Sequence, residues 1–505
     1  MKLSNKLSLT VLLTAFLLTW SSVFAEKEIT IVQGAGPRDL DPHVDETVAV
    51  MDIYRHIFEP LVQLSADGEV LPGLAKSWEW IEENKIRFYL QEGVHFHNGD
   101  EFTADTVAFN VQRIWDPEVA STKTVRLESL KTVEIIDKYT IDLVTDDSFP
   151  LLLTYLPILL MMSEHHTGDN SLDYVKQNPI GTGQFKFESW RPDQFVSLVK
   201  NNEYWGEPTN IDRLTFRIVP EAATRLAALL SGEADLVANI PPLLAPQVER
   251  SPNHLLVEGN MGLGLLLHLN TLNQGPIQNS KVRQALNYAV DLEAIINGVL
   301  GGYANPLKGQ LADETTFGFN PSLNPYEYDI ELATTLLEEA GYADGFTITL
   351  HTPQGRYPND RETAEAIAGM WNEVGINTTV VVREWGTFLE ELKGKEEAPG
   401  AWLIGWYWTP TFDASTTAAW FTTNGVYNIW DTPQEYDDWV RIANTSIVPD
   451  EREHALQQAM RILNEEAGAV FLHQPTKLYG VSTRLLNWEP RPDDALFLHY
   501  VDVKE

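Results

Sequence analysis

Apolar residues recur along this chain at the spacing of one helix face, with polar residues where such helices would begin. Val107, Val111 and Ile114 lie four and three residues apart, a spacing that puts them on one side of a helix. Thr103 and Asp105 come just before them and can accept hydrogen bonds from the free N–H groups of a first turn. The pattern predicts an amphipathic helix that packs this face into a core.

The same pattern predicts four more helices in the second half of the chain. Their apolar faces lie at Val282–Ala289, after Asp291, at Leu332–Ala340 and at Leu456–Leu463. Asp329 is expected to cap the third of these helices, and Gly341 to end it, because glycine suits the left-handed position after a helix. Asp450 and Glu453 are expected to form a capping box at the start of the fourth, which Gly468 ends.

Strands and helices alternate between residues 346 and 413. The predicted order is a strand at Phe346–His351, a helix at Arg361–Val374, a strand at Asn377–Val382, a helix at Thr387–Leu392 and a strand at Ala401–Trp406. A parallel sheet with right-handed crossovers is the simplest arrangement of such a series. Ligands of open parallel sheets bind beyond the carboxyl ends of the strands, so the residues that follow each strand are candidates for a site.

Charged and aromatic residues follow all three of these strands. The segments are Gln354–Pro358, Arg383–Trp385 and Tyr407–Asp413. For any one of them, the alternative is a solvated loop whose tryptophans pack in the core. Their coincidence at one predicted sheet edge favours a binding site.

Length, composition and charge limit the class of protein. The chain has 505 residues, and a single core stops growing at about 250–300 residues, so at least two lobes are expected. Hydrophobic residues make up 44% of it and aromatic residues 10%, as in ordinary globular proteins. With 72 acidic and 36 basic residues its formal charge is -36, which disfavours nucleic acid as a partner and also serves solubility.

The N-terminus has the features of a cleaved signal peptide. Lys2 and Lys6 precede an apolar stretch, Leu7–Trp20, and Ala25 ends a small-residue cleavage pattern. We therefore expect residues 1–25 to be removed and the protein to be periplasmic. The chain has no cysteine, so neither a disulfide nor a lipid anchor on cysteine is expected. The apolar run Leu151–Met162 is too short for a bilayer and is expected to be buried core.

Short motifs along the chain resemble those of one known family. In order they are residues 40–42 (LDP), 59–61 (EPL), 71–79 (LPGLAKSWE), 93–99 (GVHFHNG), 181–183 (GTG), 202–205 (NEYW), 229–235 (LLSGEAD), 282–286 (VRQAL) and 340–342 (AGY). This ordered set is similar to the extracytoplasmic solute-binding proteins of ABC importers, family 5, which include dipeptide-, oligopeptide-, nickel- and glutathione-binding proteins.

The resemblance implies an α/β fold with two lobes that close on a ligand like a Venus flytrap. It implies a first lobe made of residues 26–265 and 475–505, with an extra subdomain at about 66–178, and a second lobe made of residues 266–474. Gly264–Asn270 and Ala469–His473 are expected to be hinge strands, because strands that run between lobes are buried and lack alternation. Two ordinary core strands are the alternative.

The resemblance also implies how a peptide would be held. Asp413 would take the ligand's α-amino group, although it lies one residue later than in the family pattern and Ala414 stands where proline is usual. Arg356 would take a carboxylate through a bidentate fork, with pairing to Asp360 or Glu362 as the structural alternative. Neither Asp413 nor Arg356 is expected to be core. The further expected ligand contacts are Trp385, Trp406, Trp408, Tyr357 and Arg383.

The function implied is capture of a small peptide or peptide-like solute for an ABC permease, by a monomer without cofactor, metal or catalytic activity. The motifs HExxH and GxSxG and a phosphate-binding glycine loop are absent. An oligosaccharide is an alternative ligand, because Trp406, Trp408, Trp420 and Trp430 could stack on sugars. Opine-like, glutathione and metal-chelate ligands are further alternatives. The pairs His95/His97 and His165/His166 suggest metal binding, but residues 95–99 match a family-wide turn.

Overall fold

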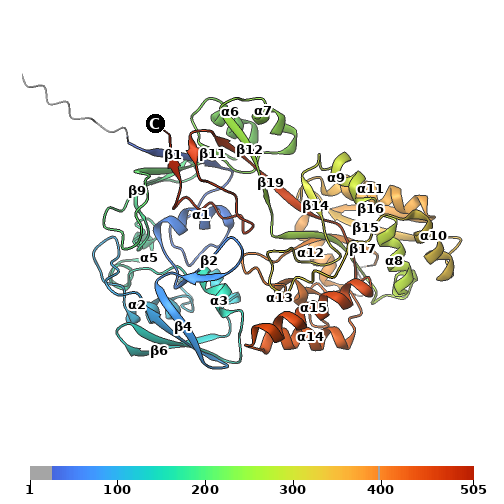
Figure 1. The fold of residues 1–505 in the computed structure, drawn as a ribbon, viewed down its shortest axis with the longest axis horizontal. Helices are drawn as coiled ribbons and strands as arrows, with labels where there is room; N and C mark the ends of the chain where they lie inside the picture. Colours follow the sequence, from blue (N-terminus) through green and yellow to red (C-terminus); the bar gives the residue numbers. More distant parts are fainter. Residues whose placement is uncertain (1–25, 396–398, 505) are drawn as a thin grey trace, which may run out of the picture.

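The protein folds into two α/β lobes that stand side by side (Figure 1). This computed structural model describes residues 26–395 and 399–504, and the elements and counts given below are those of the described residues. The predicted signal peptide, residues 1–25, lies outside them. The first lobe holds both the start and the end of the described chain, and the second lobe is formed by the middle (Figure 1).

The first lobe is built on an eight-stranded sheet. Its strand order is β12-β19-β11-β1-β10-β9-β8, and β14 pairs with β19 off this path. The strands are β1 (Glu28–Gln33), β8 (Phe185–Arg191), β9 (Phe195–Lys200), β10 (Arg213–Ile218), β11 (Leu236–Val237), β12 (His254–Asn260), β14 (Ala304–Pro306) and β19 (His473–Ser482). Central β1 pairs in parallel with β10 and β11. Its buried residues Ile29 and Ile31 pack against α1 (Val48–Ile57) in one core cluster.

A second, antiparallel sheet lies in the same lobe, in the order β4-β5-β7-β6. Its strands are β4 (Ala75–Glu82), β5 (Lys85–Leu90), β6 (Leu130–Asp137) and β7 (Thr140–Thr145). Helix α2 (Ala104–Arg113) packs Val107 and Val111 into this core, and Thr103 forms a capping box with Thr106, so the predicted amphipathic helix is confirmed. The apolar run from Leu151 forms α3 (Leu152–Tyr155) and η2 (Leu156–Ile158) and is largely buried, as predicted.

The remaining elements of this lobe are short. They are β2 (Val62–Leu64), β3 (Val70–Pro72), β20 (Leu485–Leu486), β21 (Asp502–Val503), η1 (Thr122–Val125), η3 (Pro242–Leu244), α4 (Glu164–Asp169), α5 (Leu172–Val175), α6 (Ala222–Leu230) and α7 (Ala245–Glu249). Strands β2 and β3 form a hairpin that follows α1.

The second lobe is built on a five-stranded sheet in the order β16-β15-β17-β13-β18. Its strands are β13 (Leu263–Leu269), β15 (Phe346–Pro353), β16 (Ile376–Arg383), β17 (Ala401–Tyr407) and β18 (Ala469–Phe471). Strand β15 is parallel to both β16 and β17. The predicted parallel unit is therefore confirmed, with α11 (Asp360–Glu373) between β15 and β16 and α12 (Trp385–Lys393) between β16 and β17.

The helices predicted elsewhere in this lobe also form, with an error at each end of the last one. They are α8 (Ser280–Tyr288), α9 (Leu292–Gly298), α10 (Ile330–Glu339) and α15 (Pro449–Glu465), and they accompany η4 (Pro276–Gln278), α13 (Ser415–Ala418), η6 (Ala419–Phe421) and α14 (Gln434–Thr445). Asp450 does not cap α15, because the helix begins at Pro449, whose missing N–H costs nothing at a first position. The left-handed residue after this helix is Ala467 rather than Gly468.

Apart from the short strand β14, which pairs with the start of β19, the chain crosses between the two main sheets at two places. It leaves the first after Asn260 and enters the second at Leu263, and it returns between Phe471 and His473. All seven residues of β13 are buried, as expected of a strand between lobes. The roles of these segments as hinges, and the lobe boundaries at residues 265 and 475, stay predictions.

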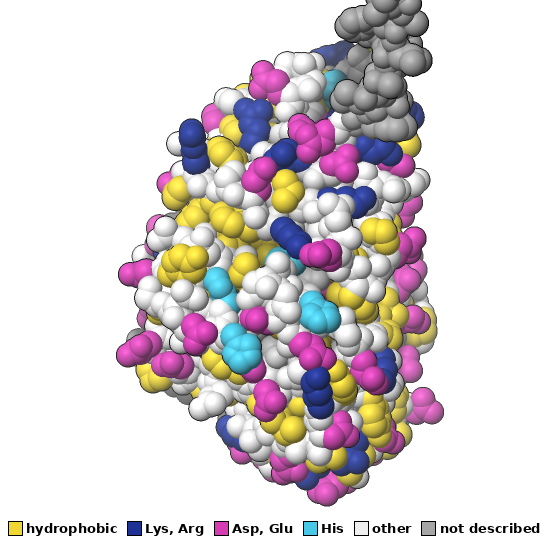
Figure 2. Space-filling model, turned by 90° about the vertical axis from the view of Figure 1, so that its left-hand side faces the viewer, with side chains coloured by type: hydrophobic (Ala, Val, Ile, Leu, Met, Phe, Trp, Pro, Cys, Tyr) yellow, Lys and Arg dark blue, Asp and Glu magenta, His cyan; other side chains and the backbone are white. Residues whose placement is uncertain are grey.

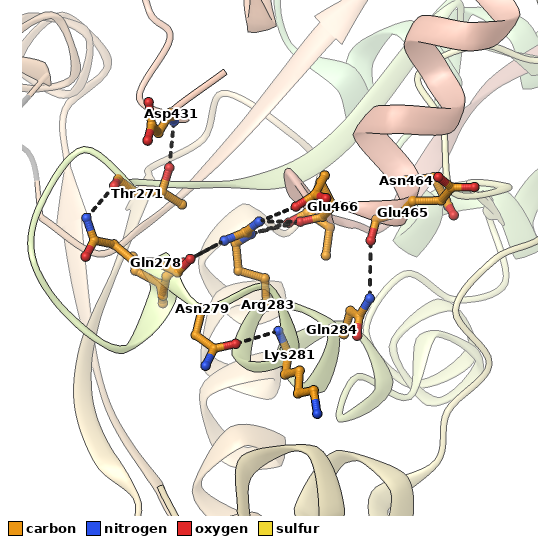
Figure 3. A network of polar contacts seen from close by, with 12 residues as sticks. Thr271, Gln278, Asn279, Lys281, Arg283, Gln284, Asp431, Asn464, Glu465 and Glu466 are labelled. Atoms are coloured by element: carbon orange, nitrogen blue, oxygen red, sulfur yellow. Dashed lines mark hydrogen bonds and ion pairs between the residues drawn. The ribbon is translucent and has the colours of Figure 1, made fainter. Parts of the chain in front are cut away.

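Arg283, in the VRQAL motif, joins α8 to the end of α15 (Figure 3). Its guanidinium donates to the carbonyls of Glu466 and Ala467, and to those of Ile277 and Gln278 in the turn before α8. A buried cation there satisfies the free carbonyls of a helix C-terminus and complements its dipole. The motif therefore has a structural explanation inside the second lobe.

Three other motifs meet at one buried carboxylate in the first lobe. Glu59 of EPL accepts hydrogen bonds from Thr182 of GTG at 2.7 Å, and from Tyr204 and Trp205 of NEYW at 2.6 and 2.8 Å. Burial raises the pKa of Glu59 in spite of these bonds. A Cβ at Gly181 would lie 2.0 Å from the carbonyl oxygen of Ile57, so glycine is required for this close backbone approach.

Candidate functional site

A cleft between the lobes is the candidate site. The loop after β17 reaches from the second lobe to the first, where Pro410 meets Pro157 and Thr154 around a cavity of about 40 Å³. Asp413 and its neighbours in the same loop face Gly68 and Leu153 across a second cavity of about 220 Å³. The hydroxyl of Ser148 also donates to the carbonyl of Thr445 at 2.5 Å, a contact between the first lobe and the end of α14.

Three predicted site residues meet at the carboxyl ends of β15 and β16. The guanidinium carbon of Arg356 lies 5.3 Å from the ring centre of Tyr357 and 5.1 Å from that of Trp385. Such cation–π contacts hold an arginine without using its hydrogen-bond donors. The side chain of Arg356 forms no ion pair with a carboxylate in residues 26–395 or 399–504.

Asp360 does not pair with the side chain of Arg356, contrary to the structural alternative. Its carboxylate instead accepts hydrogen bonds from the backbone N–H groups of Gly355, Arg356 and Tyr357, at 3.1, 2.9 and 3.2 Å. These bonds fix the loop between β15 and α11. The loop thus holds the Arg356 backbone and leaves the guanidinium available.

Two tyrosines frame Arg356. The N–H of Gly405 donates to the hydroxyl oxygen of buried Tyr357 at 2.9 Å, and burial raises the pKa of Tyr357 to about 12. Tyr407 is 39% exposed, and its hydroxyl interacts electrostatically with Arg356 and with Asp494 of the first lobe. Tyr407 belongs to the segment predicted to follow this strand, but it was not among the expected ligand contacts. Side chains alternate along a strand, so Tyr407 faces away from Trp406.

The predicted tryptophans of β17 are mostly enclosed. Trp408 is 0% exposed, and Trp406 is 7% exposed and stacks on Trp420 with ring centres 4.3 Å apart. The indole N–H of each of Trp406 and Trp408 lacks a hydrogen-bond partner among the described residues. Trp408 supports the loop from the core and in this arrangement offers no surface to a ligand. Trp430 is equally buried, which weakens the argument for sugar stacking.

Arg383 and Asp413 are already paired within the second lobe. Arg383 donates to Glu391 at 2.9 Å. Asp413 is 2% exposed and accepts from Arg452 at 2.8 Å, and from the backbone N–H and hydroxyl of Ser415 at 2.9 and 2.5 Å. The expectation that Asp413 is not core is therefore wrong. Its role as an amine anchor stays a prediction, with Arg452 as the competing partner.

The first-lobe wall of the cleft was not predicted at all. It includes Arg55, Gln63, Thr154, Arg491 and Asp493, which come from separate parts of the chain. Arg491 donates to both carboxylate oxygens of Asp493 at 2.9 and 3.0 Å. Burial alone would raise the pKa of Asp493, but these bonds hold it below its usual value.

The histidine pairs do not form a metal centre in the part of the chain that the structure describes. His97 contacts the carbonyl of Gly183 at 3.0 Å, and burial lowers its pKa to about 4. Figure 2 shows histidines on the first-lobe side, among acidic and basic side chains that are mixed rather than gathered by sign. The acidic charge is therefore spread over this face.

Comparisons with known proteins agree with this architecture. Residues 69–428 match the family model described as bacterial extracellular solute-binding proteins, family 5 middle. Heme-binding protein A of Haemophilus influenzae is 33% identical over 384 residues, 70% of this chain and 69% of that protein. Among the described helices, none has both the length and the apolar character needed to cross a membrane.

Two solved structures resemble the fold at the same identity but to different degrees. HbpA2 from Haemophilus parasuis has a TM-score of 0.87 at 26% identity, with 95% of this chain and 100% of that chain covered. DppA from Helicobacter pylori, an ABC transporter-associated periplasmic binding protein in complex with the peptide STSA, has a TM-score of 0.71 at 26% identity, with 95% and 98% covered.

Proposed function

We propose that this chain, which belongs to family 5 of the bacterial extracellular solute-binding proteins, captures a short peptide or peptide-like solute between its lobes. It delivers this ligand to an ABC permease from the periplasm and performs no chemistry on it. The peptide bound to the similar DppA of Helicobacter pylori supports this ligand class. The cleft, the loop after β17 and the ends of the parallel strands provide the place for it.

The observation that carries the proposal is the free guanidinium of Arg356. It lies against Tyr357 and Trp385 at the carboxyl end of β15, and it forms no ion pair with a described acid. A planar cation fixed on aromatic rings suits a carboxylate, because its fork matches the two oxygens. The C-terminal carboxylate of a peptide is such a group.

Closure of the lobes would enclose the ligand. The structure overlays less well on the peptide-bound DppA than on HbpA2, although identity and coverage of this chain are equal. A rotation of one lobe against the other on peptide binding would produce this difference. Closure also removes water from Arg356 and so strengthens its ion pair with the ligand.

Calorimetry with matched peptides tests the proposal. Ala-Ala with a free C-terminus should bind the wild type, and Arg356→Met should weaken this binding by roughly 2–5 kcal/mol, the usual loss when one partner of an enclosed ion pair is removed. The C-terminal amide of Ala-Ala should bind weakly to both proteins. Arg361→Met is the matched control, because Arg361 pairs with Glu365 on the exposed face of α11. Equal affinity of wild type and Arg356→Met for Ala-Ala would remove the proposed role.

A further inference from the structure

Arg55 is a cation on the first-lobe wall of the cleft whose guanidinium donates no hydrogen bond among the described residues. It lies in the last turn of α1 and is half-buried. Its guanidinium makes no ion pair or hydrogen bond with any residue that the structure describes. Asp52 and Asp493 interact with Arg55 electrostatically but accept no hydrogen bond from it, so its donors are open to a ligand.

The other charged groups around the same cavity have hydrogen-bond partners. Arg491 and Asp493 pair with each other, and Arg491 also donates to the carbonyls of Leu64 and Ser65. Glu59 accepts its three hydrogen bonds inside the lobe. His499 is neutral near pH 7, since burial lowers its pKa to about 4. Among the described residues, Arg55 interacts with Asp493 and Asp52 only electrostatically, and it is the charged side chain of this lining whose hydrogen-bond donors are unused.

The cavity has the size of a small anionic group. Its volume is about 40 Å³, room for about three water molecules at roughly 10–15 Å³ each. Arg55, Gln63 and Thr154 line it together with the paired groups named above, and Pro410 of the second lobe also lines it. A carboxylate fits such a space better than an aromatic side chain does.

The second lobe presents the matching arrangement. Arg356 has no acidic partner there among the described residues, and the carboxylate of Asp413 is neutralised by Arg452 at 2.8 Å. Each lobe thus has one arginine, Arg55 or Arg356, that forms no ion pair with a described carboxylate. A ligand that lies between the lobes and carries a negative group on each side would pair with both guanidinium groups.

We infer that the ligand is a peptide-like dicarboxylate, such as an acidic peptide, and that Arg55 is the specificity-determining residue that receives its second carboxylate. This inference rests on the proposed function, in which Arg356 receives the first. Arg55 thereby distinguishes acidic peptides from neutral peptides of the same shape.

Calorimetry with the isosteric pairs Ala-Glu/Ala-Gln and Glu-Ala/Gln-Ala tests this assignment. In the wild type we expect the acidic member of at least one pair to bind roughly tenfold tighter or more. Arg55→Gln should bring the affinities for the two members of the pair within about twofold of each other. Arg55→Lys should keep part of the preference, because it keeps the charge. Arg38→Gln, at an exposed arginine of the same lobe, should change nothing.

The outcomes separate this inference from the proposed function. If peptides bind but the acidic and neutral members bind alike, the role of Arg55 is overturned and the proposed function stands. If no peptide binds, both the role of Arg55 and the proposed function are wrong. Hemin, a porphyrin with two carboxylates, is the alternative ligand that could supply the same two anionic groups. Hemin binding that depends on Arg55, in a protein that binds no acidic peptide, would overturn the peptide assignment.

Discussion

Replacing Asp413 with asparagine should destabilise the protein. Asp413 is 2% exposed, and its partner Arg452 is almost as buried. The substitution removes the charge and leaves the guanidinium of Arg452 without a counter-ion in a place that water reaches poorly. An asparagine still accepts a hydrogen bond from Ser415, so the lost ion pair is the main change.

The expected loss follows from the burial of the pair. Removing one partner of a buried ion pair costs about 3–5 kcal/mol, because an uncompensated charge stays behind. The pair also holds the loop in which Phe412 has a left-handed backbone with φ 52°, a conformation that costs a non-glycine residue about 1–2 kcal/mol. A cooperative unit of 150–250 residues loses about 2–4 °C of melting temperature per kcal/mol. We therefore expect a fall on the order of 10 °C.

Scanning calorimetry of the ligand-free protein measures this effect. Glu365→Gln is the matched control, because the Glu365–Arg361 pair lies on an exposed helix face, where such pairs contribute about 0.3–0.5 kcal/mol. Its melting temperature should stay within about 2 °C of the wild type. Arg452→Met should be less harmful than Asp413→Asn, since it leaves a carboxylate that keeps its bonds to Ser415.

One result would contradict this reasoning. If Asp413→Asn melts like the wild type and loses all affinity for peptides with a free amino group, the carboxylate serves the ligand rather than the fold. The amine-anchor prediction would then be supported, and Arg452 would have to release Asp413 when the ligand binds.

Two further predictions follow from the hinge and from a buried histidine. The radius of gyration from X-ray scattering should fall when a bound peptide is present, because two lobes joined by β13 and the β18–β19 segment close around it; an unchanged profile with a ligand shown to bind would refute closure. His268 is fully buried, and burial lowers its pKa to about 3. In the unfolded chain this histidine binds a proton already below about pH 6.5, so the folded state loses stability as the pH falls below that value. His268→Leu should therefore lose less stability between pH 7 and pH 4 than the wild type in urea unfolding, and equal losses would contradict this.

The parallel unit of the second lobe could be predicted because its signals are local. The strand at Phe346–His351 and the helix at Arg361–Val374 each show their own period in the sequence, and each forms within one or two residues of the predicted bounds. Once parallel strands are recognised, their carboxyl ends must meet at one edge. The cluster of Arg356, Tyr357 and Trp385 follows from that rule alone.

The partners of the site residues could not be predicted in this way. Arg452 lies 39 residues from Asp413, on a helix whose apolar face and expected caps give no sign of a contact with the loop after β17. The cavity at Arg55 joins α1, β2, α3 and a segment near residue 491, and no periodicity links these segments. Whether a charge is paired depends on such long-range contacts, so the sequence alone showed neither the pair of Asp413 with Arg452 nor the position of Arg55 at the cavity.

The motifs that carry the family resemblance mainly form structural contacts inside the lobes. The carboxylate of Glu59 ties EPL to GTG and NEYW, Arg283 of VRQAL closes the end of α15, and Asp41 of LDP pairs with buried Arg113. None of these polar groups is left free to bind a solute. Arg55 and Arg356, which form no ion pair with a described carboxylate, stand outside all the motifs. Similar motifs therefore identify the scaffold, and proteins that share them can hold different ligands, because the charge that faces the cleft is set by loop and helix-end residues.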